Sequence, residues 1–205
     1  MILYLATKNL GKVREINALF AATGIEFVSA AGIMGNVVED GDTYHKNAFK
    51  KAMAVYEQNT NPVVAEDSGL EVDALDGAPG VYSARFASEE EGVNSSDEDN
   101  INALLDFIQD TPPPDRTARY VCIFCLMLGG KSLFFEGEVE GTIAMQPAGT
   151  SGFGYDPVFI PNGYDKTFSE LGDEVKNKIS HRAMAVLKLK DYLLDYLISE
   201  DQNRK

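Results

Sequence analysis

The pattern of hydrophobic and polar positions begins with an unbroken apolar run, Ile2–Ala6, which predicts a buried strand. Four apolar residues then recur at the spacing of one helix face: Val13, Ile16, Leu19 and Phe20. We expect this helix to end at Gly24, because glycine commonly follows the last turn of a helix. A second strand is predicted over Glu26–Ala30, and a second helix from Thr43 to about Gln58. This order of strands and helices predicts an α/β fold.

The next apolar segment is short and is followed by acids. Pro62 introduces Val63–Ala65, which predicts a strand, and the polar residues Glu66–Gly69 predict a turn at its end. Open α/β sheets place their chemistry at the carboxyl ends of strands, so this turn is a candidate site.

The second half of the chain predicts a loop, a helix and a hairpin. Residues 76–95 are rich in Gly, Ala, Ser and Glu and indicate a mobile loop, after which Ser96 and Asp99 match a capping box before a third helix. The runs Arg119–Leu128 and Ser132–Val139 flank two glycines and predict an antiparallel hairpin, so we expect a mixed sheet. The chain ends in a predicted amphipathic helix that carries Met184, Leu187, Leu194 and Leu197.

Length and composition fit a single domain spanning residues 1–205. The chain has 205 residues, 44% of them hydrophobic, which is enough to bury a full core. Its 18 Lys+Arg against 32 Asp+Glu give a net charge of −14, so its long-range field repels DNA and acidic membrane surfaces. The amino terminus has no basic leader with a long apolar run, and no stretch of about eighteen apolar residues occurs. We therefore expect a soluble cytoplasmic protein that binds neither nucleic acid nor membranes, although lysines and a divalent cation could still hold a small triphosphate.

Cys122 and Cys125 form a Cys-x-x-Cys spacing, which suggests a redox pair or a zinc site. A redox pair normally opens a helix, whereas these cysteines lie in a predicted strand, where positions three apart point to opposite faces. Zinc would need a second pair, and the chain has two cysteines in all. Two reduced thiols in the core are the favoured interpretation.

A candidate phosphate site follows the first strand. Its residues are Thr7, Lys8, Asn9, Leu10, Gly11 and Lys12. Free amides and the dipole at a helix amino terminus favour an anion. The spacing is not that of a Walker loop, and an ordinary capped turn fits the same residues equally well.

Two acidic segments are candidates for magnesium, which binds one or two carboxylates together with waters and substrate phosphates. Glu66 and Asp67 lie at the predicted strand end, and Asp67 is the leading candidate for the catalytic acid. Asp40 and Asp42 precede a predicted helix, where a cap or turn former is the simpler interpretation.

Candidate nucleobase contacts lie in Gly149–Pro157, where Phe153 and Tyr155 stand among glycines. An aromatic face that stacks on a base contributes about 1–3 kcal/mol, although both rings could instead belong to the core.

A donor-rich set surrounds the start of the last helix: Lys176, His181 and Arg182. Ser180 is a natural cap for this helix, so a purely structural role also fits it. His45, the only other histidine, is expected at the surface.

Five of these segments, in this order, resemble the inosine triphosphate pyrophosphatase family, and the likeness spans nearly the whole chain. The matching patterns are Thr-x-Asn-x-x-Lys at 7–12, an acid with Asp-Ser-Gly-Leu at 66–70, Gly-Ala-Pro-Gly-x-Tyr-Ser-Ala-Arg at 77–85, Phe-Gly-Tyr-Asp-Pro at 153–157 and Ser-His-Arg at 180–182. Each pattern alone is weak, but five in register are specific. The resemblance implies an elongated α/β fold, with a mixed sheet flanked by helices and two lobes around a nucleotide-binding cleft. It also implies a homodimer that hydrolyses ITP, dITP and XTP to the monophosphate and pyrophosphate.

The same resemblance implies roles for individual residues. Asp67 is the catalytic acid and a Mg²⁺ ligand. The residues expected to contact the nucleotide are Ser68, Phe153, Gly154, Tyr155, Asp156, Lys176, His181 and Arg182. The family generally has a glutamate ligand three residues before Gly41, where this chain has Val38, so Glu39 is the candidate second ligand. Lys51 keeps the family's lysine position and is a candidate phosphate contact.

The resulting hypothesis is a magnesium-dependent hydrolase. Asp67 holds the metal, Lys12 and Lys51 offset phosphate charge, and the attacking water is oriented by Asp67 or by Glu66. A module that binds nucleotides without hydrolysing them is the main alternative, and a structural protein with accidental motifs is a more distant one. Asp67 favours the enzyme, because only catalysis needs an acid over the phosphates.

Overall fold

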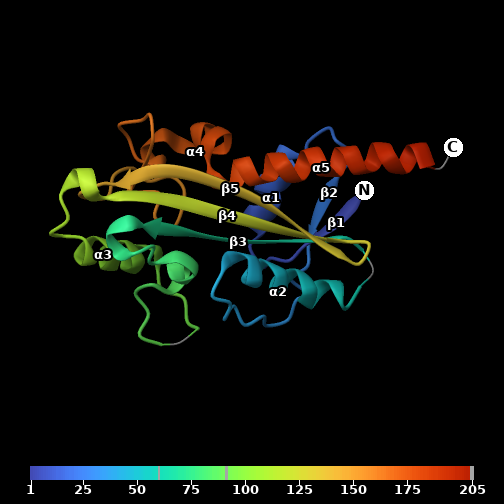
Figure 1. Cartoon of the computed structure of the whole chain (residues 1–205), viewed down its shortest axis with the longest axis horizontal. Helices are drawn as coiled ribbons and strands as arrows, with labels where there is room; N and C mark the ends of the chain where they lie inside the picture. The colour runs from blue at the N-terminus through green and yellow to red at the C-terminus, as the bar shows by residue number, and fades with distance from the viewer. Residues whose placement is uncertain (60, 91, 204–205) are drawn as a thin grey trace. The chain divides into compact units, whose positions relative to one another are not determined.

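The structure is a computed structural model that describes residues 1–59, 61–90 and 92–203. Six strands form one mixed sheet in the order β2-β1-β3-β4-β5-β6, which confirms the predicted fold class (Figure 1). The strands are β1 Ile2–Leu5, β2 Glu26–Ser29, β3 Val63–Val72, β4 Thr117–Leu128, β5 Lys131–Ile143 and β6 Phe159–Pro161. The α-helices are α1 Leu10–Leu19, α2 Tyr44–Tyr56, α3 Asp97–Phe107, α4 Phe168–Ile179 and α5 His181–Asn203, and short 3₁₀ helices span Asp73–Leu75, Gly80–Arg85 and Pro113–Asp115. Within the described ranges, no helix is both long and apolar enough to cross a membrane.

The residues divide into two compact units. Unit 1 comprises Met1–Asp67, Ile123–Glu136 and Ala185–Lys205, and unit 2 comprises Ser68–Cys122 and Gly137–Met184. Strands β3, β4 and β5 and helix α5 each contribute residues to both units. A single domain spanning residues 1–205 stays a prediction.

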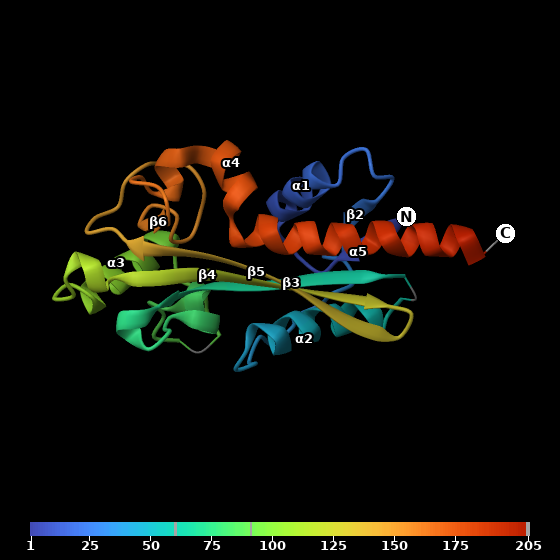
Figure 2. The ribbon, with the colours of Figure 1, turned by 45° about the horizontal axis from the view of Figure 1, so that its top comes forward.

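Unit 1 has parallel strands with helices on both faces. β1 pairs in parallel with β2, with Ile2 opposite Glu26, and also in parallel with β3. In Figure 1 and Figure 2, α2 lies on one side of these strands, and α1 lies with α5 on the other. Lys190 of α5 donates a 2.8 Å hydrogen bond to the Leu19 carbonyl at the end of α1. In β1, Leu3 and Leu5 are buried, whereas Ile2 is 56% exposed and Tyr4 is partly buried, so the predicted buried strand is fully buried on one face only.

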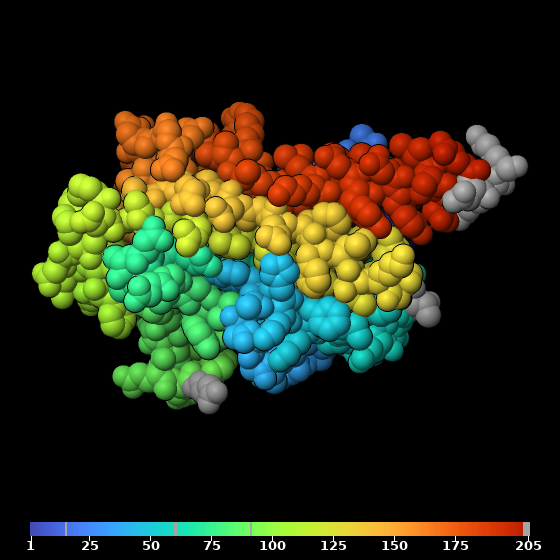
Figure 3. Space-filling model, in the orientation of Figure 1, coloured from blue at the N-terminus to red at the C-terminus, as the bar shows by residue number. Residues whose placement is uncertain are grey.

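Helix α2 also packs beside the start of β5, as the adjoining cyan and yellow surfaces in Figure 3 show. The His45 ring lies 5.0 Å from the Phe134 ring, and its Nε2 is 3.0 Å from Glu136 Oε1. The His45 side chain remains 43% exposed, which confirms its predicted surface position.

Unit 2 is organised around an apolar cluster supplied by strands and by helices α3 and α4. Its buried members include Leu70, Val72, Ile101, Leu104, Tyr120, Tyr155, Phe159 and Phe168. β6, which the sequence pattern did not predict, pairs antiparallel with β5, with Thr142 opposite Ile160.

The prediction for β3 was wrong. The strand was expected to stop at Ala65 before a polar turn, but it continues well beyond that residue, and Glu66 and Asp67 lie inside it. Both acids are buried, with 5% and 8% of their surfaces exposed. A strand can continue through buried carboxylates when cations pair with them, and Lys12 and Lys51 do so here.

Two helix predictions need correction. α1 ends at Leu19 rather than at Gly24, because Ala22 adopts a φ of 65° that no helix can continue. In α5, Met184 and Leu187 are 43% and 54% exposed. The face of α5 that is buried instead carries Ala185, Val186, Leu189 and Leu193. Both sets satisfy helical spacing, so periodicity alone did not distinguish them.

The predicted mobile loop over 76–95 contains regular structure, since a 3₁₀ helix spans Gly80–Arg85. The Ser83 hydroxyl donates to the Gly80 carbonyl at 2.6 Å and accepts from the Leu70 amide at 2.9 Å. Residue 91 of this segment lies outside the described residues.

Other predictions are confirmed. β4 and β5 are neighbours joined by two glycines with φ of 58° and 77°, and so short a connection requires an antiparallel hairpin. Ser96 caps α3 by accepting the Asp99 amide, although its hydroxyl bonds to the Asp99 carboxylate in place of the reciprocal backbone bond. Cys122 and Cys125 are buried thiols that form no disulfide, and burial raises the pKa of Cys125 to about 12.

Candidate active site

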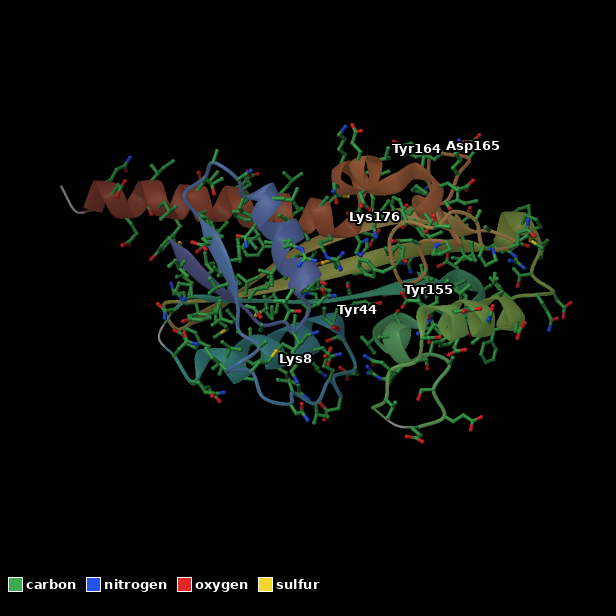
Figure 4. All side chains as sticks on the ribbon, turned by 180° about the vertical axis from the view of Figure 1, so that it is seen from behind. Lys8, Tyr44, Tyr155, Tyr164, Asp165 and Lys176 are labelled. Carbon is green, nitrogen blue, oxygen red and sulfur yellow. The ribbon has the colours of Figure 1, made fainter. Side chains whose placement is uncertain are left out.

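The loop that leads into α1 is a capped turn. Asn9 Oδ1 accepts from the amides of Gly11 at 2.8 Å and Lys12 at 3.3 Å, and the Asn9 amide donates to Thr7 Oγ1 at 3.1 Å. The chain therefore adopts the ordinary capped turn, which the sequence had left open as the alternative to a phosphate site. Three amides of the predicted phosphate site are satisfied internally, so an anion at this loop would meet the lysine side chains, including Lys8, which is labelled in Figure 4.

One of these lysines pairs with an acid of β3. Lys12 Nζ lies 2.6 Å from Glu66 Oε1, and the Glu66 side chain is 3% exposed. This pair brings the predicted phosphate loop next to the predicted acidic segment within unit 1.

A second, larger cluster joins the segment before α2, α2 itself and β3. Lys51 Nζ lies 2.7 Å from both Glu39 Oε2 and Asp67 Oδ1. Glu39, Lys51 and Asp67 thus form one group, which we call the acid cluster. The sequence pattern had placed these residues in separate segments, and the fold brings all three together.

Burial and charge act in opposite directions on the acid cluster. Burial raises the pKa of Asp67, and the Lys51 charge offsets this rise only in part. For Glu39, the effect of burial is outweighed by the charge and hydrogen bond of Lys51, so its pKa is lowered. Burial alone would lower the pKa of Lys51, but the charges of Asp67 and Glu39 raise it and keep the ammonium protonated. Two carboxylates therefore share one ammonium.

Asn47 completes the surroundings of Asp67, and sequence reasoning did not propose it. Its Nδ2 donates to Asp67 Oδ2 at 3.3 Å, and its Oδ1 accepts the Gly41 amide at 2.8 Å. Its signal in the sequence was weak, because a polar residue in the first turn of a helix is usually exposed.

The acid cluster fits a hard divalent cation. Among the described residues, no group of three or more His, Cys, Asp and Glu side chains is placed to hold a metal. The paired carboxylates of Glu39 and Asp67 match Mg²⁺, which commonly takes one or two carboxylates and completes its shell with water and phosphate. Val38, at the position where a glutamate was expected, is exposed.

The other acids before α2 lie at the surface. Asp42 pairs with Lys46 at 2.6 Å and Asp40 pairs with Lys50, and all four side chains are exposed. Thr43, not an aspartate, caps α2. Asp40 and Asp42 are thus absent from the acid cluster, but neither is the helix cap that the simpler interpretation offered.

Unit 2 holds a different group around Phe153, which we call the aromatic cluster. The Phe153 ring is 49% exposed, with Lys176 Nζ 4.3 Å and Arg182 Cζ 5.3 Å from its centre. Asp156 Oδ2 accepts from the Phe153 amide at 2.9 Å and from Lys176 Nζ. A Cβ on Gly152 would lie 2.1 Å from that same carboxylate oxygen, so this turn requires glycine.

The remaining predicted substrate residues have structural contacts in unit 2. Tyr155, labelled in Figure 4, is buried in the core, and its hydroxyl donates to the Ser83 carbonyl at 2.8 Å. The Gly154 amide donates to Asp97 Oδ2 at 2.7 Å. His181 stacks on Tyr120 with ring centres 4.6 Å apart. Phe153 is therefore the exposed ring of this turn, whereas Tyr155 is a core ring.

Two further positions complete the placement of the predicted site residues. Ser180 is the cap that the sequence predicted, since its Oγ accepts the Ala183 amide at 3.2 Å. Ser68 lies half-buried on β3, directly after Asp67.

Comparisons with known proteins agree with one another. The profile of the Ham1 family matches residues 3–192. A dITP/XTP pyrophosphatase of Aquifex aeolicus is 45% identical, covering 92% of this chain and 95% of its own, and one of Halalkalibacterium halodurans is 44% identical, covering 92% and 96%. Among solved structures, a HAM1 protein from Coxiella burnetii superposes with a TM-score of 0.87 at 35% identity, covering 95% of this chain and 99% of its own. The Staphylococcus aureus Ham1 protein superposes with a TM-score of 0.84 at 37% identity, covering 94% and 98%.

Proposed function

The chain belongs to the Ham1 family, and from this premise we propose that it hydrolyses deaminated purine nucleoside triphosphates, among them ITP, dITP and XTP, to the monophosphate and pyrophosphate. The chain is thus a hydrolase that acts on a phosphoanhydride bond and removes non-standard purines from the nucleotide pool. The two dITP/XTP pyrophosphatases named above match 92% of the chain, so the similarity is not confined to one motif.

The acid cluster is the observation that carries this proposal at the level of residues. Cleaving a phosphoanhydride requires neutralising the phosphoryl oxygens and presenting a water in line with the leaving group. A cluster with two carboxylates and a lysine supplies groups for both tasks.

Mg²⁺ is the cofactor that the donor set fits, with Glu39 and Asp67 as its protein ligands. When bound, it neutralises charge on the phosphoryl oxygens and orients the phosphates. The attacking water is oriented by Asp67 or by Glu66.

The lysines of unit 1 serve the phosphates. Lys51 pairs with two carboxylates and Lys12 with one in this structure, and in the proposed complex both exchange part of that pairing for phosphate oxygens. Lys8, on the loop before α1, adds a third ammonium. Thr7, Asn9, Leu10 and Gly11 shape this loop and set where the lysines emerge.

Unit 2 serves the base. Phe153 offers an exposed face for stacking, and stacking accepts any base. Selection therefore falls to donors: Arg182 can only donate hydrogen bonds, so it suits the six-keto group of hypoxanthine and xanthine and not the amino group of adenine. The other nucleotide contacts proposed in unit 2 are Ser68, Gly154, Tyr155, Asp156, Lys176 and His181.

A homodimer in the cytoplasm completes the proposal. The support for the dimer is the family resemblance, and the negative net charge of −14 speaks against nucleic-acid and membrane partners. Light scattering coupled to gel filtration tests the dimer directly: the molecular mass should be twice the 22.4 kDa of one chain.

Product analysis tests the function. With ITP and Mg²⁺, the account predicts inosine monophosphate and pyrophosphate in equal amounts, with turnover abolished by a chelator. Release of orthophosphate with inosine diphosphate would identify a different phosphatase. Tight binding of ITP without any product would instead support the nucleotide-sensing alternative.

A further inference from the structure

Asn47 occupies an unusual place for a polar residue in the first turn of a helix. It is 1% exposed, and its side chain faces the backbone of the segment before α2. Its Oδ1 accepts the Gly41 amide at 2.8 Å, while its Nδ2 lies 3.4 Å from the Gly41 carbonyl and 3.3 Å from Asp67 Oδ2. One amide thus contacts both backbone groups of one residue and a carboxylate of the acid cluster.

Gly41 is shaped for this contact. A Cβ there would lie 2.6 Å from Asn47 Oδ1 and 2.8 Å from the Cβ of Lys46, and both distances are shorter than real Cβ contacts. The φ of Gly41 is not in the left-handed region, so close approach and not backbone conformation is the reason for glycine here. Gly41 lies two residues after Glu39. Holding the Gly41 backbone in place therefore also fixes the position from which the Glu39 side chain projects.

We propose that Asn47 is a positioning residue, which clamps the Glu39–Gly41 segment to the Asp67 carboxylate so that both carboxylates address one cation. The inference rests on the proposed function and deepens it. Lys51 also contacts both acids, but its positive charge neutralises them, so the Lys51 ammonium competes with a metal ion for the two carboxylates. The Asn47 amide carries no charge, so it orders the same two segments and leaves their negative charge available to a cation. Groups that orient metal ligands in this way typically contribute 10- to 100-fold to affinity.

Asn17 provides a matched control within unit 1. Its Oδ1 accepts the Phe27 amide at 2.8 Å, and its Nδ2 donates to the Phe27 carbonyl at 2.8 Å. This repeats the double contact that Asn47 makes with Gly41. In the part of the chain that the structure describes, the Asn17 side chain makes no hydrogen bond to a carboxylate. Loss of either amide should therefore cost comparable stability, but only loss of Asn47 should disturb a metal site.

The test compares Asn47→Ala with Asn17→Ala by direct metal binding. Mn²⁺ serves as the probe for the magnesium site, and free Mn²⁺ is measured by electron paramagnetic resonance without nucleotide. Asn47→Ala should raise the dissociation constant for Mn²⁺ by about tenfold or more, whereas Asn17→Ala should leave it unchanged at a similar loss of melting temperature. Equal dissociation constants in the two variants, or a wild-type protein that binds no Mn²⁺, would overturn the proposal.

Gly41→Ala gives a second route that keeps the Asn47 side chain. The new Cβ should displace the amide and raise the Mn²⁺ dissociation constant as Asn47→Ala does, and the double variant should be no worse than either single one. Fully additive effects would show two independent contacts and contradict the clamp. Hydrolysis of ITP by the wild-type protein is followed in parallel. If that hydrolysis is absent, the proposed function fails, while the Mn²⁺ constants still decide the clamp.

Discussion

The acid cluster of unit 1 and the aromatic cluster of unit 2 are built with opposite charge. In the acid cluster, two carboxylates face one ammonium, so the formal sum is −2 + 1 = −1. In the aromatic cluster, Lys176 and Arg182 lie near the Phe153 ring and Asp156 pairs with Lys176, so the formal sum is +2 − 1 = +1. An excess of carboxylate attracts a cation, and an excess of donors attracts an acceptor such as a keto group.

The two clusters are also held by different means. Regular elements, α2 and β3, supply two of the three members of the acid cluster, whereas the ring of the aromatic cluster projects from a glycine-containing turn fixed by hydrogen bonds to Asp156 and Asp97. This difference fits the proposed division of labour, in which unit 1 performs the chemistry and unit 2 selects the base. Substitutions in either cluster test one side of that division.

The largest expected effect comes from Asp67→Asn, which keeps the shape of the side chain and removes its charge. Turnover of ITP should fall by at least about a hundredfold, since both metal binding and water orientation depend on that carboxylate. Pyrophosphate release measures the effect. Asp42→Asn, which removes an exposed acid paired with Lys46, is the control and should retain full turnover. If Asp67→Asn kept more than half of normal turnover, Asp67 would not be the catalytic acid.

The next effect concerns selection. Arg182→Ala should lower kcat/KM for ITP far more than for ATP, and the ratio of the two should shrink by about thirtyfold, equivalent to about 2 kcal/mol for a charged donor. Arg182 is buried, so melting temperatures must accompany the kinetics. Arg119→Ala, which breaks a partly exposed ion pair with Glu71 in the same unit, should leave the ratio unchanged. Equal losses for ITP and ATP would assign Arg182 to general binding or folding.

Glu39→Gln should raise the Mg²⁺ concentration needed for half-maximal activity by about tenfold, because one of the two proposed ligands loses its charge. At saturating Mg²⁺, most of the turnover should return, in contrast to Asp67→Asn. A magnesium titration of the variant beside the wild-type protein gives the answer, and superimposable curves would remove Glu39 from the site.

The smallest effect is expected at Phe153. Phe153→Ala should raise KM about fivefold for ITP and ATP alike, since stacking contributes about 1 kcal/mol at the lower end of its range and does not distinguish bases. Phe153→Tyr keeps an aromatic face and should restore the wild-type KM. A KM that rises for ITP but not for ATP would mean that the ring takes part in selection.

The sequence predicted the α/β class, the hairpin and most elements, because periodicity and turn residues act locally. It failed at β3, since no local pattern reveals that Lys12 and Lys51 come from elsewhere to pair with Glu66 and Asp67. Without those partners, two adjacent acids favour a turn, so the prediction followed the local rule and tertiary pairing overrode it.

The candidate site was predicted in parts but not in its geometry. The motifs indicated Asp67 and Phe153, and the structure then separated Phe153, which is exposed, from Tyr155, which is buried. The Asn47 contact with Gly41 could not be predicted from the sequence, because the sequence pattern of a helix does not show whether a particular asparagine side chain is buried or exposed. The prediction of which face of α5 is buried failed for a related reason, since two sets of apolar residues fit helical spacing equally well.

The division of labour between the clusters is tested most directly by binding to a protein that cannot complete the reaction. Because Asp67→Asn should turn over slowly, dissociation constants for intact ITP and ATP can be measured on it by calorimetry. The account predicts that Asp67→Asn prefers ITP by at least about tenfold, and that this preference disappears when Arg182→Ala is added. Equal affinities of ITP and ATP for Asp67→Asn would contradict the account, because selection would then depend on the acid that performs the chemistry.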